Sequence, residues 1–141
     1  MPRYDRARFL AFGLLSTVNV VALLIHGLGL ATHGRGGAAA SLPWLVVLAG
    51  LWLLLALHAA VRRGRDLDWP ALQTIATFAV ALAFGPALLV LIAFLSLAKT
   101  GTAPNRFGPP APRPSIATWL AALLLQGLPW GLLAVAARLL A

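Results

Sequence analysis

Four long apolar segments constrain this chain more than any other feature of its sequence. They extend from Phe9 to Ala31, from Leu42 to Val61, from Pro70 to Ala98 and from Ile116 to Leu140. A helix needs about 20 mostly apolar residues to cross the roughly 30 Å hydrocarbon core of a bilayer. The sequence therefore predicts an all-α integral membrane protein, a bundle of four transmembrane helices that forms a single domain over residues 1–141.

The composition favours a membrane over water as the surroundings of the chain. The chain is 61% hydrophobic and only 10% charged, whereas soluble domains have about 25% charged residues. A signal peptide is the alternative for the first segment, because Arg3, Arg6 and Arg8 precede it, but signal cores extend only about 7 to 15 residues. We therefore expect this segment to remain as an anchor. The chain has no cysteine, which excludes disulfides and iron-sulfur clusters.

Gly85 and Pro86 interrupt the third apolar segment near its middle. At about 1.5 Å per residue, a continuous helix over this segment would extend about 43 Å, which exceeds the thickness of a bilayer core. We interpret the segment as one long, tilted helix kinked at Gly85-Pro86, because each half of a re-entrant hairpin would have to be shielded by protein within the membrane. The hairpin is the alternative, and it would return the chain to the side on which the segment begins.

The distribution of Lys and Arg predicts the orientation, because basic residues in short loops favour the cytoplasmic side. With four spans and an inside N-terminus, seven basic residues lie inside and four outside. The inside group is Arg3, Arg6, Arg8, Arg62, Arg63, Arg65 and Arg138, and the outside group is Arg35, Lys99, Arg106 and Arg113. We therefore expect a cytoplasmic N-terminus.

Charge is concentrated between the second and third segments, in the stretch RRGRDLDW of residues 62–69. Asp66 and Asp68 can pair with the neighbouring arginines, and the surplus arginine suits bidentate contact with phosphate. Either aspartate is also positioned to cap the next helix, with Pro70 at its first position and Trp69 in the interfacial belt. The net charge of +8 indicates anionic lipid instead of nucleic acid, because the basic residues flank apolar helices.

Other candidate chemistry is weakly supported. His26 and His58 would lie about 18 Å apart along the membrane normal in antiparallel helices, and no acidic residue accompanies His33. We therefore expect no metal and no cofactor. A proton-coupled exporter needs an ionisable carboxylate within the membrane, whereas all three acidic residues lie at helix ends.

Three short motifs occur in order between the apolar segments. They are Arg3-x-x-Arg6-x-x-Phe9, then Arg62-Arg63-Gly64-Arg65-Asp66 with Trp69, and then Gly101-Thr102 followed by Asn105-Arg106-Phe107-Gly108-Pro109. Together they resemble the YhaH-like family of small bacterial inner-membrane proteins, a domain of unknown function (DUF 805), over about residues 3–110. Leu10 stands where the family usually has tryptophan, Arg65 replaces a histidine and Asp68 replaces a glycine. The apolar helix over about 116–140 extends beyond the family's usual end. The resemblance implies a bacterial inner-membrane location without an established activity.

We expect a non-enzymatic accessory or scaffold protein that engages anionic lipid headgroups, another membrane protein or a second copy of the chain. The predicted contact residues are Arg3, Arg6, Arg62, Arg63, Asp66, Trp69, Asn105, Arg106 and Phe107. One alternative is a transporter or channel subunit with a polar path along Asn19, Gln73 and Gln126. The other is a membrane enzyme acting on a lipid phosphate, with Arg62 and Arg106 as clamps. That enzyme requires two connections to lie on the same membrane face: the second loop, between the second and third apolar segments, and the third loop, between the third and fourth.

Overall fold

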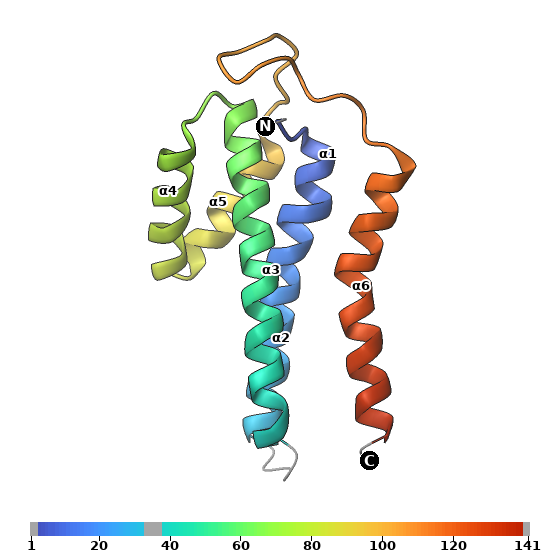
Figure 1. Cartoon of the computed structure of the whole chain (residues 1–141). Helices are drawn as coiled ribbons and strands as arrows, with labels where there is room; N and C mark the ends of the chain where they lie inside the picture. The colour runs from blue at the N-terminus through green and yellow to red at the C-terminus, as the bar shows by residue number, and fades with distance from the viewer. Residues whose placement is uncertain (1–2, 33–37, 140–141) are drawn as a thin grey trace.

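Helices account for the regular structure in the computed structural model, which describes residues 3–32 and 38–139, and no β-strand occurs within those ranges. The first apolar segment is one continuous helical rod made of α1 (Arg6–Phe9), the π-helical turn η1 (Leu10–Leu14) and α2 (Leu15–Thr32). This rod lies antiparallel beside α3 (Ala38–Asp66), and the two form the long axis of the molecule (Figure 1). His33, Arg35 and Leu140, on which parts of the sequence interpretation rested, lie outside the described residues.

The π-helical turn places the aromatic residue of the first motif inside the protein. A π turn fits one additional residue into a helix and alters the direction of the side chains around it. The ring of Phe9 lies so close to Gly13 that a Cβ there would be 2.4 Å from it. Phe9 is consequently fully buried against its own helix and its neighbours.

The predicted single kinked helix over 70–98 is wrong. This segment forms two short helices, α4 (Ala71–Ala83) and α5 (Pro86–Leu97), which form a hairpin and return the chain to the end at which α4 begins (Figure 1). Gly85 has φ 57°, a conformation that glycine adopts without steric cost. Pro86 lacks a backbone N–H and has a fixed φ, so it begins a helix here instead of kinking one.

Protein shields the inner side of this hairpin, which removes the physical objection to it. The largest core cluster lies in the half of the molecule that contains the N-terminus, where the first helical rod, α3, α4 and α5 meet. Its buried members are Phe9, Ala11, Phe12, Ala56, Ala59, Ala60, Phe78, Ala81, Leu88, Leu91, Ile92, Leu95 and Ala122. The three alanines of α3 allow close approach of the neighbouring helices. One face of α5 is therefore buried against protein, while its opposite face, which is also apolar, stays exposed.

The last helix, α6 (Ile116–Leu139), contacts the bundle through polar groups as well as through apolar packing of Ala122 and Trp130. Gln126 donates a hydrogen bond to Ser16 Oγ at 2.8 Å and accepts one from Asn19 Nδ2 at 2.7 Å. Pro129 lacks the N–H that would bond the carbonyl four residues earlier. Trp52 of α3 replaces it, since its Nε1 donates to that carbonyl, on Leu125, at 3.1 Å.

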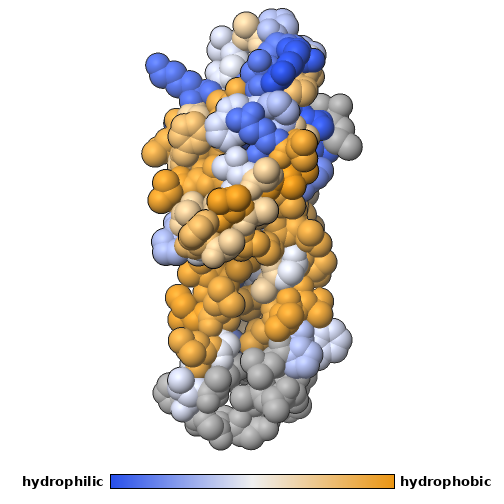
Figure 2. Space-filling view, turned by 90° about the vertical axis from the view of Figure 1, so that its left-hand side faces the viewer, coloured by the Kyte–Doolittle hydropathy of each residue, from blue (hydrophilic) through white to orange (hydrophobic). Residues whose placement is uncertain are grey.

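In the described part of the chain, three helices are long and apolar enough to cross a membrane: residues 6–29, 43–66 and 116–135. The α4 and α5 helices are apolar but shorter. Figure 2 shows hydrophobic residues over the middle of the face in view and hydrophilic residues gathered at the end that contains the N-terminus. The helical fold and its apolar character are as predicted, whereas the third segment does not form a long helix.

Candidate functional site

The hairpin brings most of the basic residues to one end of the molecule, here called the basic end. Because α4 and α5 return the chain, the connections before α4 and after α5 lie together, next to the N-terminus (Figure 1). The basic end contains nine of the eleven Lys and Arg residues: Arg3, Arg6, Arg8, Arg62, Arg63, Arg65, Lys99, Arg106 and Arg113. All three sequence motifs meet there.

Arg63, in the last turn of α3, is the centre of this region and is 0% exposed. Its Nε donates to the carbonyl of Leu95 at 3.0 Å, and its Nη2 donates to the carbonyl of Ala98. The last carbonyls of a helix have no partner within the helix, and a cationic side chain satisfies them well. Arg63 therefore fastens the C-terminus of α5 to α3.

Asp66, which is 5% exposed, accepts a hydrogen bond from the third nitrogen of this guanidinium. Its Oδ2 lies 2.5 Å from Arg63 Nη1 and accepts the backbone N–H of Gly101 at 3.2 Å. A Cβ on Gly101 would lie 3.1 Å from the carbonyl oxygen of Asp66. The glycine of the third motif thus allows the loop after α5 to approach the end of α3.

Two arginines of the N-terminal segment hold the loop that leads to α6. Arg3 is 2% exposed, and its guanidinium donates to the carbonyls of Pro109 at 2.9 Å and Ala103 at 3.2 Å. Its Nε also lies 3.8 Å from Asp66 Oδ1. Arg8 donates to the carbonyls of Pro112 and Arg113. Arg3 of the first motif and the nearby Arg8 therefore act within the protein as backbone anchors.

The third motif forms a tight turn that closes over the end of α3. Asn105 Nδ2 donates to the carbonyl of Arg65 at 2.8 Å, while Asn105 Oδ1 accepts the N–H of Phe107 at 2.9 Å. The guanidinium carbons of Arg106 and Arg65 lie 4.9 Å and 5.9 Å from the centre of the Phe107 ring, within cation–π range. Arg106 Nε also pairs with Asp68 Oδ1 at 3.1 Å. Asn105 thus fixes the turn, and Phe107 separates two cations.

Aromatic contacts complete the basic end. Trp69 stacks on Phe94 of α5 at 5.7 Å with an interplanar angle of 16°. The guanidinium carbon of Arg62 lies 5.0 Å from the centre of the Tyr4 ring. Neither predicted cap forms at the start of α4: Asp66 and Asp68 bind arginines, and Pro70 itself takes the N-cap position without a side-chain cap. The two aspartates therefore pair with arginines that lie close in space instead of capping the N-terminus of α4.

The nine predicted contact residues lie together, but in two environments. Arg3, Arg63 and Asp66 are buried and bonded to one another or to backbone. Arg6 and Arg106 are exposed, while Arg62, Trp69, Asn105 and Phe107 are half-buried. The motif residues therefore divide into an internal scaffold and an outer charged surface.

The proposed polar path does not converge on one place. Asn19 and Gln126 share a hydrogen bond, whereas Gln73 is exposed on α4, which does not take part in that network. Among the residues that the structure describes, no group of three or more His, Cys, Asp or Glu is placed to hold a metal ion.

Two further residues, Arg8 and Gly64, contribute to the basic end without a role predicted from the sequence. In the sequence Arg8 is only a topological charge, whereas in the structure it anchors the loop. At Gly64, a Cβ would lie 2.3 Å from Thr74 Oγ1, so this glycine lets α4 pack against α3. A glycine between arginines inside a helical pattern is the signal that could have identified it, because such a glycine can mark a close packing contact.

Comparison with known proteins gives one family match. The family model described as "Protein of unknown function (DUF805)" matches residues 2–109. A search of curated proteins found no match, and a search of solved structures found none either. The matched region includes all three motifs and the α4–α5 hairpin and ends before α6.

Proposed function

The chain belongs to the DUF805 family, whose function is unknown, and we propose from its geometry that it is a non-enzymatic membrane accessory protein whose basic end engages anionic phospholipid headgroups. The observation that carries this proposal is the gathering of nine basic residues at one end of an apolar helical molecule. Each Lys or Arg near an anionic membrane surface contributes about 1 kcal/mol of attraction. The exposed cations Arg6, Lys99, Arg106 and Arg113 form the headgroup surface in this proposal.

The buried centre supports the proposal by fixing the position of those exposed charges. Arg63 and Asp66 fasten α5 and its following loop to α3, while Arg3 and Arg8 hold the remainder of the loop. A fixed array of cations binds anionic headgroups with less loss of side-chain and loop entropy than a mobile loop would. The motif residues then serve the lipid surface in two ways, by direct contact and by holding its backbone.

The proposed membrane placement follows from the same geometry. Three helices cross the bilayer, and the α4–α5 hairpin enters it only from the side of the basic end. The basic end then carries nine cationic residues, whereas Arg35 and Arg138 are the two that remain for the other side. The positive-inside rule places the basic end in the cytoplasm, and the resemblance of the motifs supports the bacterial inner membrane as the location.

Cysteine accessibility tests this placement, since the natural chain has no cysteine. Single probes at the exposed residues Asp68, Thr102 and Thr32 are labelled in intact cells with a membrane-impermeant reagent. We expect the first two to be protected together and the third to react. Reaction of Asp68 and Thr102 on opposite sides of the membrane would overturn the proposed arrangement.

Headgroup selectivity tests the function itself. The full chain is placed in bilayers of phosphatidylglycerol and phosphatidylcholine, and the preference of its boundary lipid for phosphatidylglycerol is measured. Replacing Arg6 and Lys99 with Gln is expected to lower this preference by up to about fivefold per charge. The matched control replaces Arg35 and Arg138 with Gln, which removes the same charge from outside the basic end. Equal preference in both variants and the natural chain would exclude lipid engagement by the basic end.

One observation also favours the lipid-phosphate enzyme as a second candidate. The hairpin brings the second and third loops to the same end, which that reading requires. However, Arg62, which that candidate needs as a clamp, is half-buried and lies over Tyr4. Turnover of a lipid phosphate by the purified chain, abolished by replacing Arg62 with Gln, would replace the accessory proposal with this one.

A further inference from the structure

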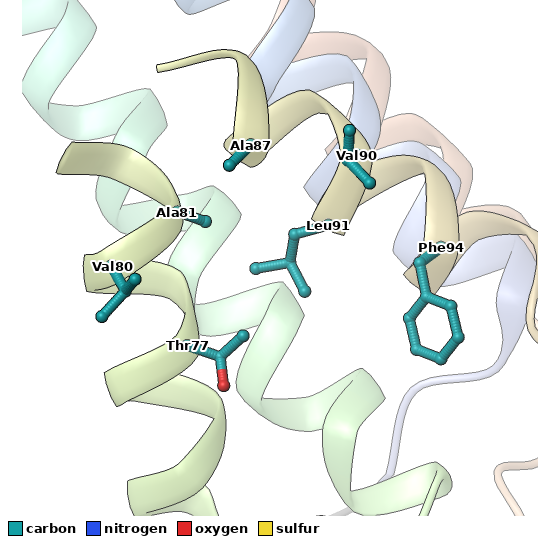
Figure 3. A pocket seen from close by; sticks show the side chains of 7 residues that line it. All are labelled: Thr77, Val80, Ala81, Ala87, Val90, Leu91 and Phe94. Carbon is teal, nitrogen blue, oxygen red and sulfur yellow. The ribbon is translucent and has the colours of Figure 1, made fainter. Parts of the chain in front are cut away.

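An open groove of about 490 Å³ lies between the two helices of the hairpin. Its lining side chains come from both helices, as Figure 3 shows: Thr77, Val80, Ala81, Ala87, Val90, Leu91 and Phe94. Thr77 is the one polar residue among them. At about 1.5 Å per residue, helices of this length extend roughly 20 Å, which is enough to enter one leaflet but too short to cross the core. The groove is therefore an apolar cleft at the depth of acyl chains.

A series of contacts connects this groove to the basic end. Phe94 lines the groove and stacks on Trp69, and the residue before Trp69 is Asp68. Asp68 is paired with Arg106, whose side chain is 54% exposed. The groove thus extends toward a charged surface that contains an accessible guanidinium.

The charge at this surface is complementary to an anion. Arg65 and Arg106 both lie within cation–π range of the Phe107 ring, and Asp68 is paired with Arg106. Two guanidinium groups beside one carboxylate leave an excess of positive charge. In addition, Arg65 Nε is buried and has no hydrogen-bond partner among the described residues. A phosphate suits this position, because guanidinium groups bind its oxygens through paired N–H donors.

We infer that the α4–α5 groove binds an acyl chain of an anionic phospholipid whose phosphate is bound by Arg65 and Arg106. The ligand has the two chemical parts that the structure places next to each other, an apolar cleft and a cationic surface. This inference rests on the proposed function and assigns it a single lipid site. A neutral lipid would fill the groove but leave the guanidinium groups without their anion.

The experiment uses the full chain in bilayers that contain a nitroxide probe on one acyl chain. Phosphatidylglycerol carrying the probe is compared with phosphatidylcholine carrying the same probe, and electron paramagnetic resonance measures the motionally restricted fraction. The natural chain is expected to restrict more phosphatidylglycerol than phosphatidylcholine. Replacing Arg106 with Gln is expected to lower this preference by roughly fivefold, the effect of one lost cation at the headgroup.

Two substitutions block the groove from different sides. Ala87→Phe fills the groove from a half-buried position in the first turn of α5, and Val90→Phe fills it from an exposed position. If one variant fails to fold, the other still tests the groove. Both are expected to lower the excess of restricted phosphatidylglycerol as much as Arg106→Gln does, while the excess due to the other exposed cations of the basic end remains. The matched control is Ala93→Phe, which adds the same ring at an exposed position of α5 outside the lining and is expected to keep the excess. Circular dichroism verifies the helix content of each variant.

The possible outcomes separate the groove from the proposed function. If folded Ala87→Phe and Val90→Phe chains keep the full excess, the groove assignment is overturned while headgroup engagement stands. Equal restriction of both lipids by the natural chain would overturn the phosphate assignment and the proposed function together. If the groove variants change the size of the assembled protein without changing lipid restriction, the groove is a contact between copies of the chain and the inference fails.

Discussion

Replacing Arg63 with methionine tests whether the buried centre holds the hairpin to the long apolar helix α3. Methionine keeps most of the apolar stem of the side chain and removes the guanidinium. The carbonyls of Leu95 and Ala98 then lose their hydrogen-bond donor, and the carboxylate of Asp66 loses its nearest cation. The variant therefore removes polar partners while largely preserving packing.

The expected loss of stability follows from the burial of the groups left behind. Breaking a buried ion pair by removing one partner costs about 3–5 kcal/mol, and each unpaired buried acceptor adds about 1–3 kcal/mol. Arg3 remains 3.8 Å from Asp66 and offsets part of the loss. We expect the free energy of unfolding to fall by at least about 3 kcal/mol. The double variant Arg63→Met/Asp66→Leu also removes the isolated charge. Its loss of unfolding free energy should be about 1–3 kcal/mol smaller than the summed losses of the single variants Arg63→Met and Asp66→Leu.

Equilibrium unfolding in mixed micelles of a mild detergent and dodecyl sulfate, monitored by circular dichroism, measures these free energies. The control is Arg113→Met, the same change at an exposed arginine of the basic end, which should stay within about 0.5 kcal/mol of the natural chain. A loss below about 1 kcal/mol for Arg63→Met, or fully additive losses in the double variant, would show that the ion pair does not hold α5 to α3.

Three further predictions follow from the packing of the helices. Gly64→Ala should destabilise the protein by about 1–3 kcal/mol through overpacking against α4, whereas Gly50→Ala, on an open face of the same helix, should be neutral or stabilising in the same unfolding assay. Trp52→Phe should lower stability by about 1 kcal/mol and have less effect in a Pro129→Ala background, because a helix N–H then satisfies the carbonyl that the indole binds. Equal losses in both backgrounds would contradict that account. Asn105→Ala should loosen the turn after α5 by about 1–2 kcal/mol, measured as faster amide hydrogen exchange in residues 99–110, and unchanged exchange would exclude its role in fixing the turn.

The part of the fold that was predicted correctly depends on local patterns. Helix in the first, second and fourth apolar segments follows from runs of apolar residues long enough to span a bilayer, and the structure places helices there. The family was also identifiable, because its motifs are short, ordered and composed of distinctive residues such as Asn105-Arg106-Phe107. Neither inference needs a contact between distant parts of the chain.

The conformation of the third segment depends on contacts that lie far apart in sequence. Gly85-Pro86 is compatible with both a kink and a hairpin turn, since glycine and proline interrupt a helix in either case. The choice depends on whether protein shields each half, and the shielding comes from Phe9, the alanines of α3 and the cap that Arg63 provides for α5. Those contacts exist only after the chain has folded.

The sequence by itself determined that this protein is helical and apolar, that it belongs to its family and that its charges lie at the ends of helices. The tertiary structure decided which ends meet. It divided the arginines into those that bind backbone carbonyls inside the basic end, such as Arg3 and Arg63, and those that face outward, such as Arg6 and Arg106. The physical reason is that a guanidinium can donate hydrogen bonds to a carbonyl, a carboxylate or a phosphate, so the groups that folding brings within reach determine its role.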